Sequence, residues 1–270
     1  MAVRDTSCVV STGVTSTERT DPAGLHVVRR AIAGTPEAPT VVIVHGGMDR
    51  ASSFGRVARS LPDVSLIRYD RRGYGLSRAA GVVPVEGHVE DLLAIIGDEQ
   101  VVIFGHSVGA IIALMVAEHR PDLVRSVLAY EPPLPWEPWW PKPSRDRAEL
   151  SAADHAERFM RRMVGEDIWN RLPPKTRADR RAEGEALRAD LESLNQAQPI
   201  FNASAVRCPV ISAAGSETTW WHLQAAGELA SMLPIGEPVV VPGASHGVHL
   251  SHPALTADLI RRALLAKRVV

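Results

Sequence analysis

The chain has 270 residues, of which 45% are hydrophobic and 23% charged, and its formal net charge is -1. A chain of this length and composition can bury a full core, as one large domain or as one domain with an insertion, which argues against disorder. Acids match the many arginines, so no basic excess is left for nucleic acid or an anionic membrane. We expect a small-molecule substrate as partner, and the composition leaves the oligomeric state open.

The cysteines and the apolar runs bear on the compartment. Cys8 and Cys208 are the only cysteines, too few for a disulfide framework or a cysteine-rich metal site. Residues 1–14 lack the apolar run of a signal peptide, and no stretch of about 18 apolar residues occurs. We therefore expect a soluble, cytoplasmic protein that does not span a membrane.

Short β-branched runs alternate with longer amphipathic stretches along most of the chain. In chain order, the expected strands are 41–45, 64–69, 101–104, 125–130, 209–214 and 238–241. The expected helices between them are 52–61, 87–96, 108–119, 222–233 and 253–265. Apolar strands that alternate with helices indicate an α/β fold with a mostly parallel, doubly wound sheet. The segment 25–33 favours an antiparallel hairpin at the edge of this sheet.

One segment breaks the alternation. Residues 132–205 contain no convincing strand, only a Pro-rich start and charged helical stretches at 148–164 and 177–195. Arginines and glutamates alternate in them, as is typical of solvated helix faces. We expect residues 1–131 to form the first part of a core domain, 132–205 a helical cap, and 206–270 the second part of the core.

The strongest chemical signal is the run Gly-His-Ser-Val-Gly at 105–109, which follows an apolar strand and opens an apolar helix. So sharp a turn strains the backbone of Ser107, while Gly105 and Gly109 let the chain pass without collision. The helix N-terminus beneath the hydroxyl favours negative charge. The context predicts Ser107 as a nucleophile, whereas without it the motif would be an ordinary turn.

A serine hydroxyl needs a base near neutral pH. His246 ends the run Gly-Ala-Ser-His directly after the strand 238–241, and we predict that it is this base. The remaining histidines near the motifs are expected to pack or to face solvent: His45, His106, His249 and His252. They form no convincing metal-ligand set, so no metal is expected.

Acyl transfer also needs hydrogen-bond donors for an oxyanion. The run Val-His-Gly-Gly-Met at 44–48 lies at the carboxyl end of a strand. It predicts an oxyanion hole formed by the N–H groups of Gly47 and Val108, with Met48 in contact with the substrate. Taken alone, the two glycines would indicate only a turn.

Four segments in order resemble the α/β-hydrolase superfamily along nearly the whole chain. Residues 41–47 resemble its oxyanion strand and loop, 70–77 (Asp-Arg-Arg-Gly-Tyr-Gly-Leu-Ser) its D-x-R-G-x-G-x-S segment, 105–109 its nucleophile elbow and 243–253 its histidine loop. The resemblance implies the α/β-hydrolase fold, the chain order nucleophile, acid, histidine, a helical cap after the sixth strand, and no cofactor.

The acid departs from the family pattern. Members usually carry it as G-x-x-D after the seventh strand, where this chain has Gly-Ser-Glu-Thr, with Thr218 in place of Asp. Glu217 is one residue off, whereas Glu131 ends the sixth strand before a rigid Pro-Pro, a position from which some members orient their histidine. We prefer Glu131 and keep Glu217 as the alternative. Glu131 and the Ser-His-Pro run at 251–253 resemble zearalenone lactonases, which suggests lactones.

Five of the six tryptophans fall in segments expected to be loops at the carboxyl edge of the sheet, where open α/β folds bind ligands. These residues are Trp136, Trp139, Trp140, Trp220 and Trp221. Their rigid faces suit a bulky hydrophobic substrate, with Trp136, Trp139, Trp140 and Trp221 as contacts, although each could simply join cap to core.

The predicted function is hydrolysis of an ester or lactone through an acyl-enzyme. Cleavage of a carbon–carbon bond, thioester or amide by the same triad stays open. A non-catalytic receptor for a small ligand is a further alternative, because a fold can keep its scaffold and lose turnover.

Overall fold

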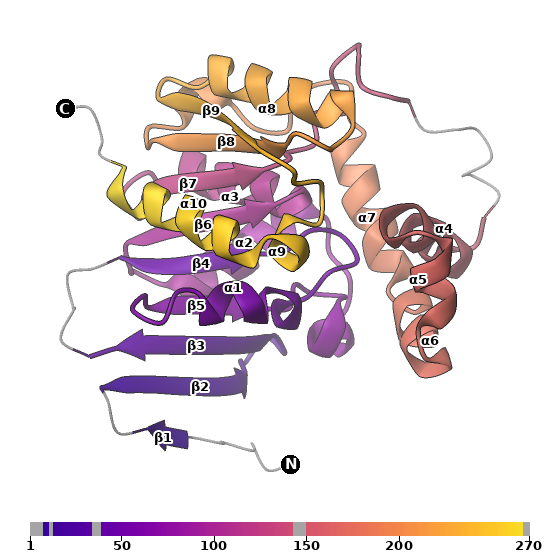
Figure 1. Ribbon diagram of the computed structural model, residues 1–270, viewed down its shortest axis with the longest axis horizontal. Helices are drawn as coiled ribbons and strands as arrows, with labels where there is room; N and C mark the ends of the chain where they lie inside the picture. Colours follow the sequence, from indigo (N-terminus) through magenta and orange to yellow (C-terminus); the bar gives the residue numbers. More distant parts are fainter. Residues whose placement is uncertain (1–7, 11–12, 34–38, 143–149, 267–270) are drawn as a thin grey trace.

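The computed structural model describes residues 8–10, 13–33, 39–142 and 150–266, which are built around one sheet (Figure 1). Within these ranges, nine strands follow the spatial order β1-β2-β3-β5-β4-β6-β7-β8-β9. The strands are β1 (Cys8–Val10), β2 (Val14–Thr20), β3 (His26–Ile32), β4 (Thr40–Val44), β5 (Leu66–Tyr69), β6 (Val101–His106), β7 (Val124–Tyr130), β8 (Val210–Gly215) and β9 (Gly236–Val241). Strands β1, β2, β3 and β5 pair antiparallel, and all pairs from β5 to β9 are parallel. The predicted edge hairpin is therefore confirmed.

Helices connect the strands. They are η1 (Ala51–Phe54), α1 (Gly55–Arg59), η2 (Gly75–Ala80), α2 (Val85–Ile96), α3 (Val108–His119), α4 (Ala152–Val164), α5 (Glu166–Arg171), α6 (Pro174–Arg181), α7 (Gly184–Leu194), η4 (Ala203–Ala205), α8 (Trp220–Met232), α9 (Val248–Ser251) and α10 (Pro253–Leu265). In the described part of the chain, none of them has both the length and the apolar character needed to cross a membrane.

The sheet is covered on both faces, as a parallel sheet must be. Helices α2, α3 and α8 pack on one face, and α1, α9 and α10 on the other (Figure 1). The central helix α3 is apolar on every side, and its residues from Val108 to Ala117 are buried, as is typical of a helix inside a core. On the opposite face, Phe54 and Ile260 pack in one cluster with Phe104 and Leu128 of the sheet. The predicted doubly wound α/β architecture is confirmed.

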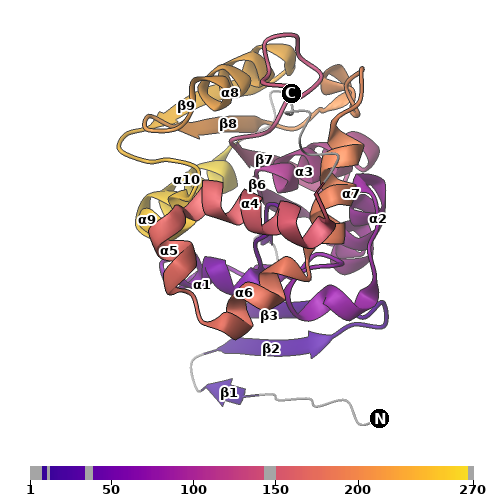
Figure 2. The same ribbon diagram turned by 90° about the vertical axis from the view of Figure 1, so that its right-hand side faces the viewer.

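Helices α4 to α7 form a group beside one end of the strands (Figures 1 and 2). The predicted stretch 148–164 corresponds to α4, which begins at Ala152, and residues 148 and 149 lie outside the described ranges. The predicted helical stretch 177–195 corresponds to two helices, α6 and α7, with a short interruption between them, and α5 was not predicted. Gly184 is the first residue of α7 and packs tightly on α4, because a Cβ there would collide with the carbonyl of Ala152. The boundaries 132–205 for a cap remain our proposal.

One further prediction was wrong. Trp220 and Trp221 open helix α8 and do not lie in a loop. Thr219 has the extended backbone of an N-cap (φ -72°, ψ 148°), so the helix begins at the next residue, two positions before the predicted start.

Candidate active site

The turn between β6 and α3 holds Ser107 in a strained conformation. Its φ is 55° and its ψ -126°, and its N–H donates to the carbonyl of Tyr130 at 2.9 Å. A Cβ on Gly105 would collide with the carbonyl of Gly109, and a Cβ on Gly109 with that of Val44. Both glycines are therefore required for the helix to leave the strand so abruptly.

Backbone strain is concentrated at one edge of the sheet. Among the described residues, three that are not glycine have positive φ: Met48 (59°), Ser107 (55°) and Glu131 (47°). They follow the carboxyl ends of β4, β6 and β7, which are neighbours in the sheet. Left-handed backbone at such residues costs energy and clusters at functional sites. The strain thus marks this edge as the candidate site.

Glu131 contacts His246. The Oε2 atom of Glu131 lies 2.6 Å from Nδ1 of His246, and the glutamate side chain is fully buried. Burial raises the pKa of Glu131, but the hydrogen bond and charge of His246 outweigh it and hold that pKa below its ordinary value. An ionised carboxylate only accepts, so Nδ1 of His246 carries the proton and Nε2 has the free lone pair.

The loop that carries His246 is tied to the elbow. Nε2 of His106, the residue before Ser107, donates to the carbonyl of His246 at 2.7 Å. The centroids of these two imidazole rings are 4.7 Å apart. The contact holds the histidine loop against the strand that ends at the serine.

The segment at the end of β8, where the family usually has its acid, donates hydrogen bonds to the carboxylate of Glu131. Thr218 Oγ1 donates to Oε2 of Glu131 at 2.9 Å, and the N–H of Gly215 donates to Oε1 at 3.1 Å. Glu217 is exposed, and its backbone N–H, not its carboxylate, contacts the histidine loop at the carbonyl of Ala244 (2.9 Å). Of the two candidate acids, the structure brings Glu131 to His246.

His222 in the first turn of α8 was missed by the sequence analysis. Its Nδ1 lies 3.3 Å from Oε2 of Glu131, and its ring stacks on that of His246 with centroids 5.0 Å apart. Burial, and then the charge of His246, lowers the pKa of His222 to about 4. A neutral imidazole therefore flanks the Glu131–His246 pair. Its position one helical turn after Thr218 could have indicated it.

The loop after β4 is held by Arg71. This guanidinium donates to the carbonyls of His45 (3.0 Å) and Gly46 (3.1 Å). Carbonyl and N–H point in opposite directions across a trans peptide, so the N–H of Gly47 points away from Arg71. A Cβ on Gly46 would lie 3.0 Å from Cβ of Ser107, so this loop passes directly beside the serine.

Val108, the other predicted oxyanion donor, is the first residue of α3. The first N–H groups of a helix have no partner inside it. Its N–H is therefore available at the elbow, on the residue that follows the serine.

A buried ion pair links this loop to α7. Arg71 donates to Asp190 through Nη1 (2.9 Å) and Nη2 (2.8 Å), and the Tyr74 hydroxyl donates to Asp190 at 2.7 Å. Burial raises the pKa of Asp190, but the Arg71 charge lowers it well below its ordinary range. The Arg71–Asp190 pair therefore connects the loop that carries Gly47 to helix α7.

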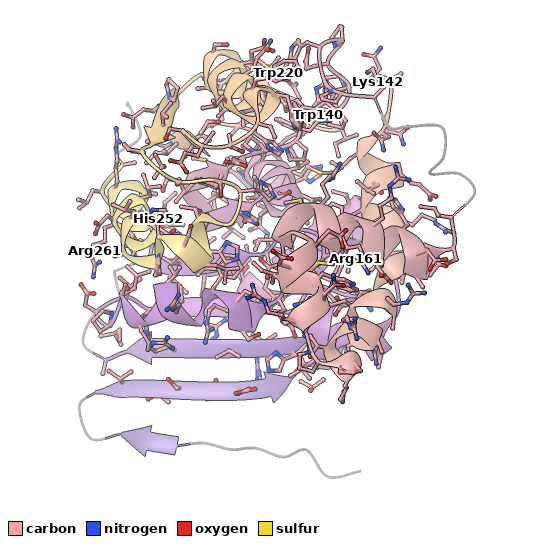
Figure 3. The ribbon with its side chains drawn as sticks, turned by 45° about the vertical axis from the view of Figure 1, so that its right-hand side comes forward. Trp140, Lys142, Arg161, Trp220, His252 and Arg261 are labelled. Atoms are coloured by element: carbon pink, nitrogen blue, oxygen red, sulfur yellow. The ribbon has the colours of Figure 1, made fainter. Side chains whose placement is uncertain are left out.

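Four tryptophan rings lie next to one another beside the stacked rings of His222 and His246. We call them the tryptophan wall: Trp139, Trp140, Trp220 and Trp221. The rings of Trp140 and Trp221 lie 5.4 and 6.1 Å from that of His222. Trp139 lies 6.3 Å from Trp220, and Figure 3 shows Trp140 and Trp220 at the same end of the molecule. An aromatic surface therefore begins at the candidate catalytic pair.

Two other predicted substrate contacts lie elsewhere. Trp136 packs on Phe201, with ring centroids 6.0 Å apart. Met48 is buried in a cluster with Tyr74 and Trp169, between the loop after β4 and the helices of 152–194. The structure does not bring these two residues into the tryptophan wall.

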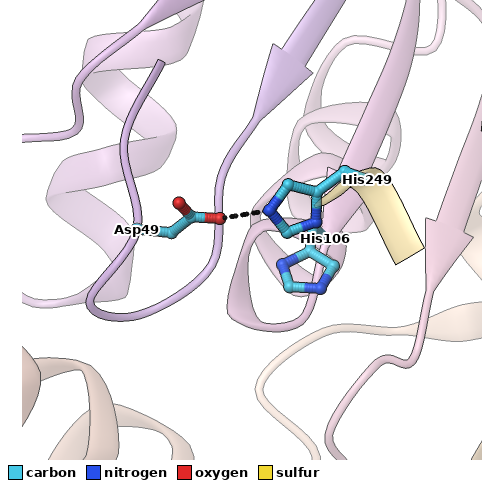
Figure 4. Close-up of side chains that lie close together, drawn as sticks. All are labelled: Asp49, His106 and His249. Carbon is cyan, nitrogen blue, oxygen red and sulfur yellow. Dashed lines mark ion pairs between the residues drawn. The ribbon is translucent and has the colours of Figure 1, made fainter. Parts of the chain in front are cut away.

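Two groups of side chains have an arrangement that could hold a metal ion. One is Glu131, His222 and His246; the other is Asp49, His106 and His249 (Figure 4). In each group, one ligand atom per residue lies within 4.8 Å of the others. Contrary to the expectation from sequence, His106 and His249 are thus neighbours with a carboxylate beside them.

Comparison with known proteins agrees with the geometry. Residues 41–259 match the model of the family described as "Alpha/beta hydrolase family". The chain is 36% identical over 101 residues to the hydrolase YraK of Bacillus subtilis and 32% identical over 111 residues to the lipase LipV of Mycobacterium tuberculosis. These matches cover 35% and 40% of this chain, but only 37% and 41% of the two relatives.

Solved structures share the fold. An alpha/beta hydrolase from Sphaerobacter thermophilus superposes with a TM-score of 0.66 at 24% identity, over 90% of this chain and 98% of the other. Together with the family match, this confirms the α/β-hydrolase fold predicted from the four motifs. The narrower likeness to zearalenone lactonases stays a prediction.

Proposed function

Because the chain belongs to the alpha/beta hydrolase family, we propose that it is a serine hydrolase that cleaves an ester or lactone of a bulky hydrophobic small molecule. The observation that carries the proposal is the 2.6 Å contact between Glu131 Oε2 and His246 Nδ1, tied to the elbow of Ser107 through His106. The lipase LipV, which matches 40% of the chain at 32% identity, supports an acyl substrate.

The mechanism follows from the protonation states at the site. Nε2 of His246 takes the proton of the Ser107 hydroxyl, whose oxygen attacks the carbonyl carbon and forms a tetrahedral oxyanion. The N–H groups of Gly47 and Val108 stabilise this oxyanion. His246 then gives its proton to the leaving alcohol, and the acyl group remains on the serine.

Water completes the cycle. His246 removes a proton from water, the resulting hydroxide attacks the acyl-enzyme, and the acid leaves as Ser107 regains its proton. Through both steps Glu131 fixes the tautomer of His246 and stabilises its imidazolium. The low pKa of Glu131 keeps it ionised for this role.

The substrate class follows from the tryptophan wall, which contacts His222 and through it the ring of His246. Rigid aromatic faces bury large apolar groups at little entropic cost. Glu228 accepts a hydrogen bond from Nε1 of Trp139 at 3.0 Å, so this indole N–H is already partnered. This composition suits an apolar acyl or alkoxy group, such as an aromatic lactone.

A substrate panel tests the proposal. Short aliphatic esters, bulky aromatic esters, macrolactones and thioesters are assayed with the wild type and with Ser107→Ala. We expect turnover of bulky esters or lactones that falls by several orders of magnitude in the variant. Turnover that persists in Ser107→Ala would reject the serine mechanism. A preference for thioesters would show that the substrate is a thioester and not an ester or lactone.

The wall is tested on the same panel with Trp139→Ala and Trp221→Ala, and Trp136→Ala is the matched control because that ring packs on Phe201 instead. The two wall variants should lose their preference for bulky over short substrates, while Trp136→Ala keeps the wild-type ranking. If all three variants keep that ranking, the wall is structural and the bulky-substrate proposal fails.

A further inference from the structure

We propose that Asp49, His106 and His249 form a binding site for a divalent transition-metal ion, Zn²⁺ being the best match, behind the proposed catalytic residues. This site is separate from the Glu131–His246 pair, and its existence does not depend on the proposed hydrolytic function. The argument rests on the two imidazole rings, on the carboxylate and on the loops that carry them.

The hydrogen bond of His106 leaves one of its ring nitrogens able to bind a metal ion. Its Nε2 bonds to the carbonyl of His246 at 2.7 Å, and a carbonyl only accepts, so Nε2 carries the proton and Nδ1 has a free lone pair. The residue is 4% exposed, and Nδ1 has no hydrogen-bond partner. Metal-binding histidines typically donate their other N–H to such a carbonyl, which fixes the tautomer.

His249 supplies the second nitrogen. Its residue is 3% exposed, and its ring stacks on Phe54 with centroids 4.3 Å apart, which fixes the ring plane. Nε2 lies 3.1 Å from Oδ2 of Asp49, yet neither ring nitrogen has a partner in hydrogen-bond geometry. Two buried histidines thus present unpartnered nitrogens beside a carboxylate, and such groups are costly unless something satisfies them.

The ligand set indicates the class of ion. Two imidazoles and one carboxylate bind Zn²⁺, or Co²⁺ in its place, and leave a fourth position open. Bonds of about 2.0 to 2.2 Å put tetrahedral ligand atoms roughly 3.3 Å apart. One possible ligand atom of each residue already lies within 4.8 Å of those of the other two (Figure 4), so small side-chain movements would complete the site.

The ion would join three segments that are far apart in the sequence. Asp49 lies in the loop after β4, His106 ends β6 beside the serine, and His249 lies in α9 directly after the loop of His246. These segments carry the proposed oxyanion donor, nucleophile and base. Bound metal would therefore fix the three loops relative to one another and stabilise the folded chain.

Binding is measured on the full chain after treatment with a chelator and dialysis. Calorimetric titration with Zn²⁺, and titration with Co²⁺ followed by its visible absorption, should give one ion per chain. Asp49→Asn and His249→Gln, which keep side-chain size roughly constant, should each weaken binding at least tenfold. Glu131→Gln and His222→Gln alter the other histidine–carboxylate group and should bind as the wild type does.

Thermal unfolding gives a second measurement that needs no substrate. Saturating Zn²⁺ should raise the Tm of the wild type, of Glu131→Gln and of His222→Gln, because a ligand of the folded state stabilises it. It should not raise that of Asp49→Asn. Absence of stoichiometric binding in the wild type would overturn the proposal, and so would binding that Glu131→Gln or His222→Gln abolishes while Asp49→Asn retains it.

Discussion

Glu131 and Thr218 follow two neighbouring strands, and together they provide and orient the carboxylate that contacts His246. Thr218 stands where the family usually has its acid, and its hydroxyl donates to Oε2 of Glu131, the oxygen that contacts His246. The residue at the end of β8 therefore orients the carboxylate at the end of β7. We infer that the acid has moved by one strand while the histidine has kept its partner.

This inference predicts the effect of removing each carboxylate. Glu131→Gln should lower kcat by about a thousandfold to ten-thousandfold, because His246 loses its charge partner and tautomer control. Glu217→Gln, the matched control, alters an exposed carboxylate and should leave kcat near the wild-type value. Steady-state kinetics on the best substrate decide this, and a crippled Glu217→Gln enzyme would show that the acid was assigned to the wrong residue.

The shared position also predicts a rescue. In the Glu131→Gln background, Thr218→Asp puts a carboxylate back within reach of His246, since Thr218 Oγ1 lies 2.9 Å from the oxygen that contacts Nδ1. The double variant should recover part of the lost kcat, about tenfold or more over the single variant. Glu131→Gln with Thr218→Asn is the uncharged control. Equal kcat for the Asp and Asn double variants would contradict the relocated acid.

The sequence predicted those residues of the candidate site that directly follow strands and lie in recognisable motifs. Ser107 and His246 follow buried strands and lie in short runs of small residues, so periodicity and turn chemistry place them. His222 and Asp49 have no such motif. They meet their partners because α8 and the loop after β4 fold over the same end of the sheet, and the local signal named above is the spacing of His222 from Thr218.

Among the elements, the loop after β4 depends on the segment after β5. Arg71 holds the carbonyls of His45 and Gly46 and pairs with Asp190 of α7. This single guanidinium, fully buried, thereby determines which way the Gly47 N–H points. Arg71 occupies the first variable position of the D-x-R-G-x-G-x-S segment, and its contacts join that segment to the loop after β4.

Arg71→Lys should therefore impair turnover. Lysine keeps the charge but lacks the planar fork that reaches two carbonyls and both carboxylate oxygens, so kcat/KM should fall by about tenfold to a hundredfold through a misplaced donor. Arg72→Lys is the matched control, because Arg72 pairs with Asp91 and the carbonyl of Ala80. An equal loss in both variants, with equal loss of Tm, would indicate a stability effect instead.

At the scale of elements, the helices predicted at 108–119 and 253–265 have the bounds of α3 and α10, and the six predicted strands are close to those observed. Buried β-branched runs define strands to within a few residues, as for 125–130 against β7. The division of 177–195 into α6 and α7 was not predicted, and at the start of α7 Gly184 makes a close tertiary contact with Ala152 of α4. Helical periodicity alone does not report such a contact.

For the whole molecule, buried histidines predict a loss of stability on acidification. Burial, as the largest cause, lowers the pKa of His45 and His222 to about 4 from the ordinary 6.5. The unfolded chain takes up these protons near pH 6.5 and the folded chain only near pH 4. Their contribution to the free energy of unfolding is therefore fully present above pH 6.5 and is lost as the pH falls from 6.5 towards 4.

Urea unfolding between pH 7.5 and 4.5 measures this slope. His222→Gln should lose less stability than the wild type over that interval, because one of the buried histidines with a lowered pKa is gone. His252→Gln changes a half-buried histidine between α9 and α10 and should keep the wild-type slope. An unchanged slope in His222→Gln would contradict the assignment of a neutral, buried imidazole beside Glu131.

The central claim is that Ser107, activated by the Glu131–His246 pair, is a nucleophile, and covalent labelling tests it most directly. The wild type is treated with a fluorophosphonate, and the modified peptide is identified by mass spectrometry. We predict one adduct per chain on Ser107, much slower labelling in Glu131→Gln, and none in Ser107→Ala. An unmodified wild type, or an adduct on another serine, would contradict the account.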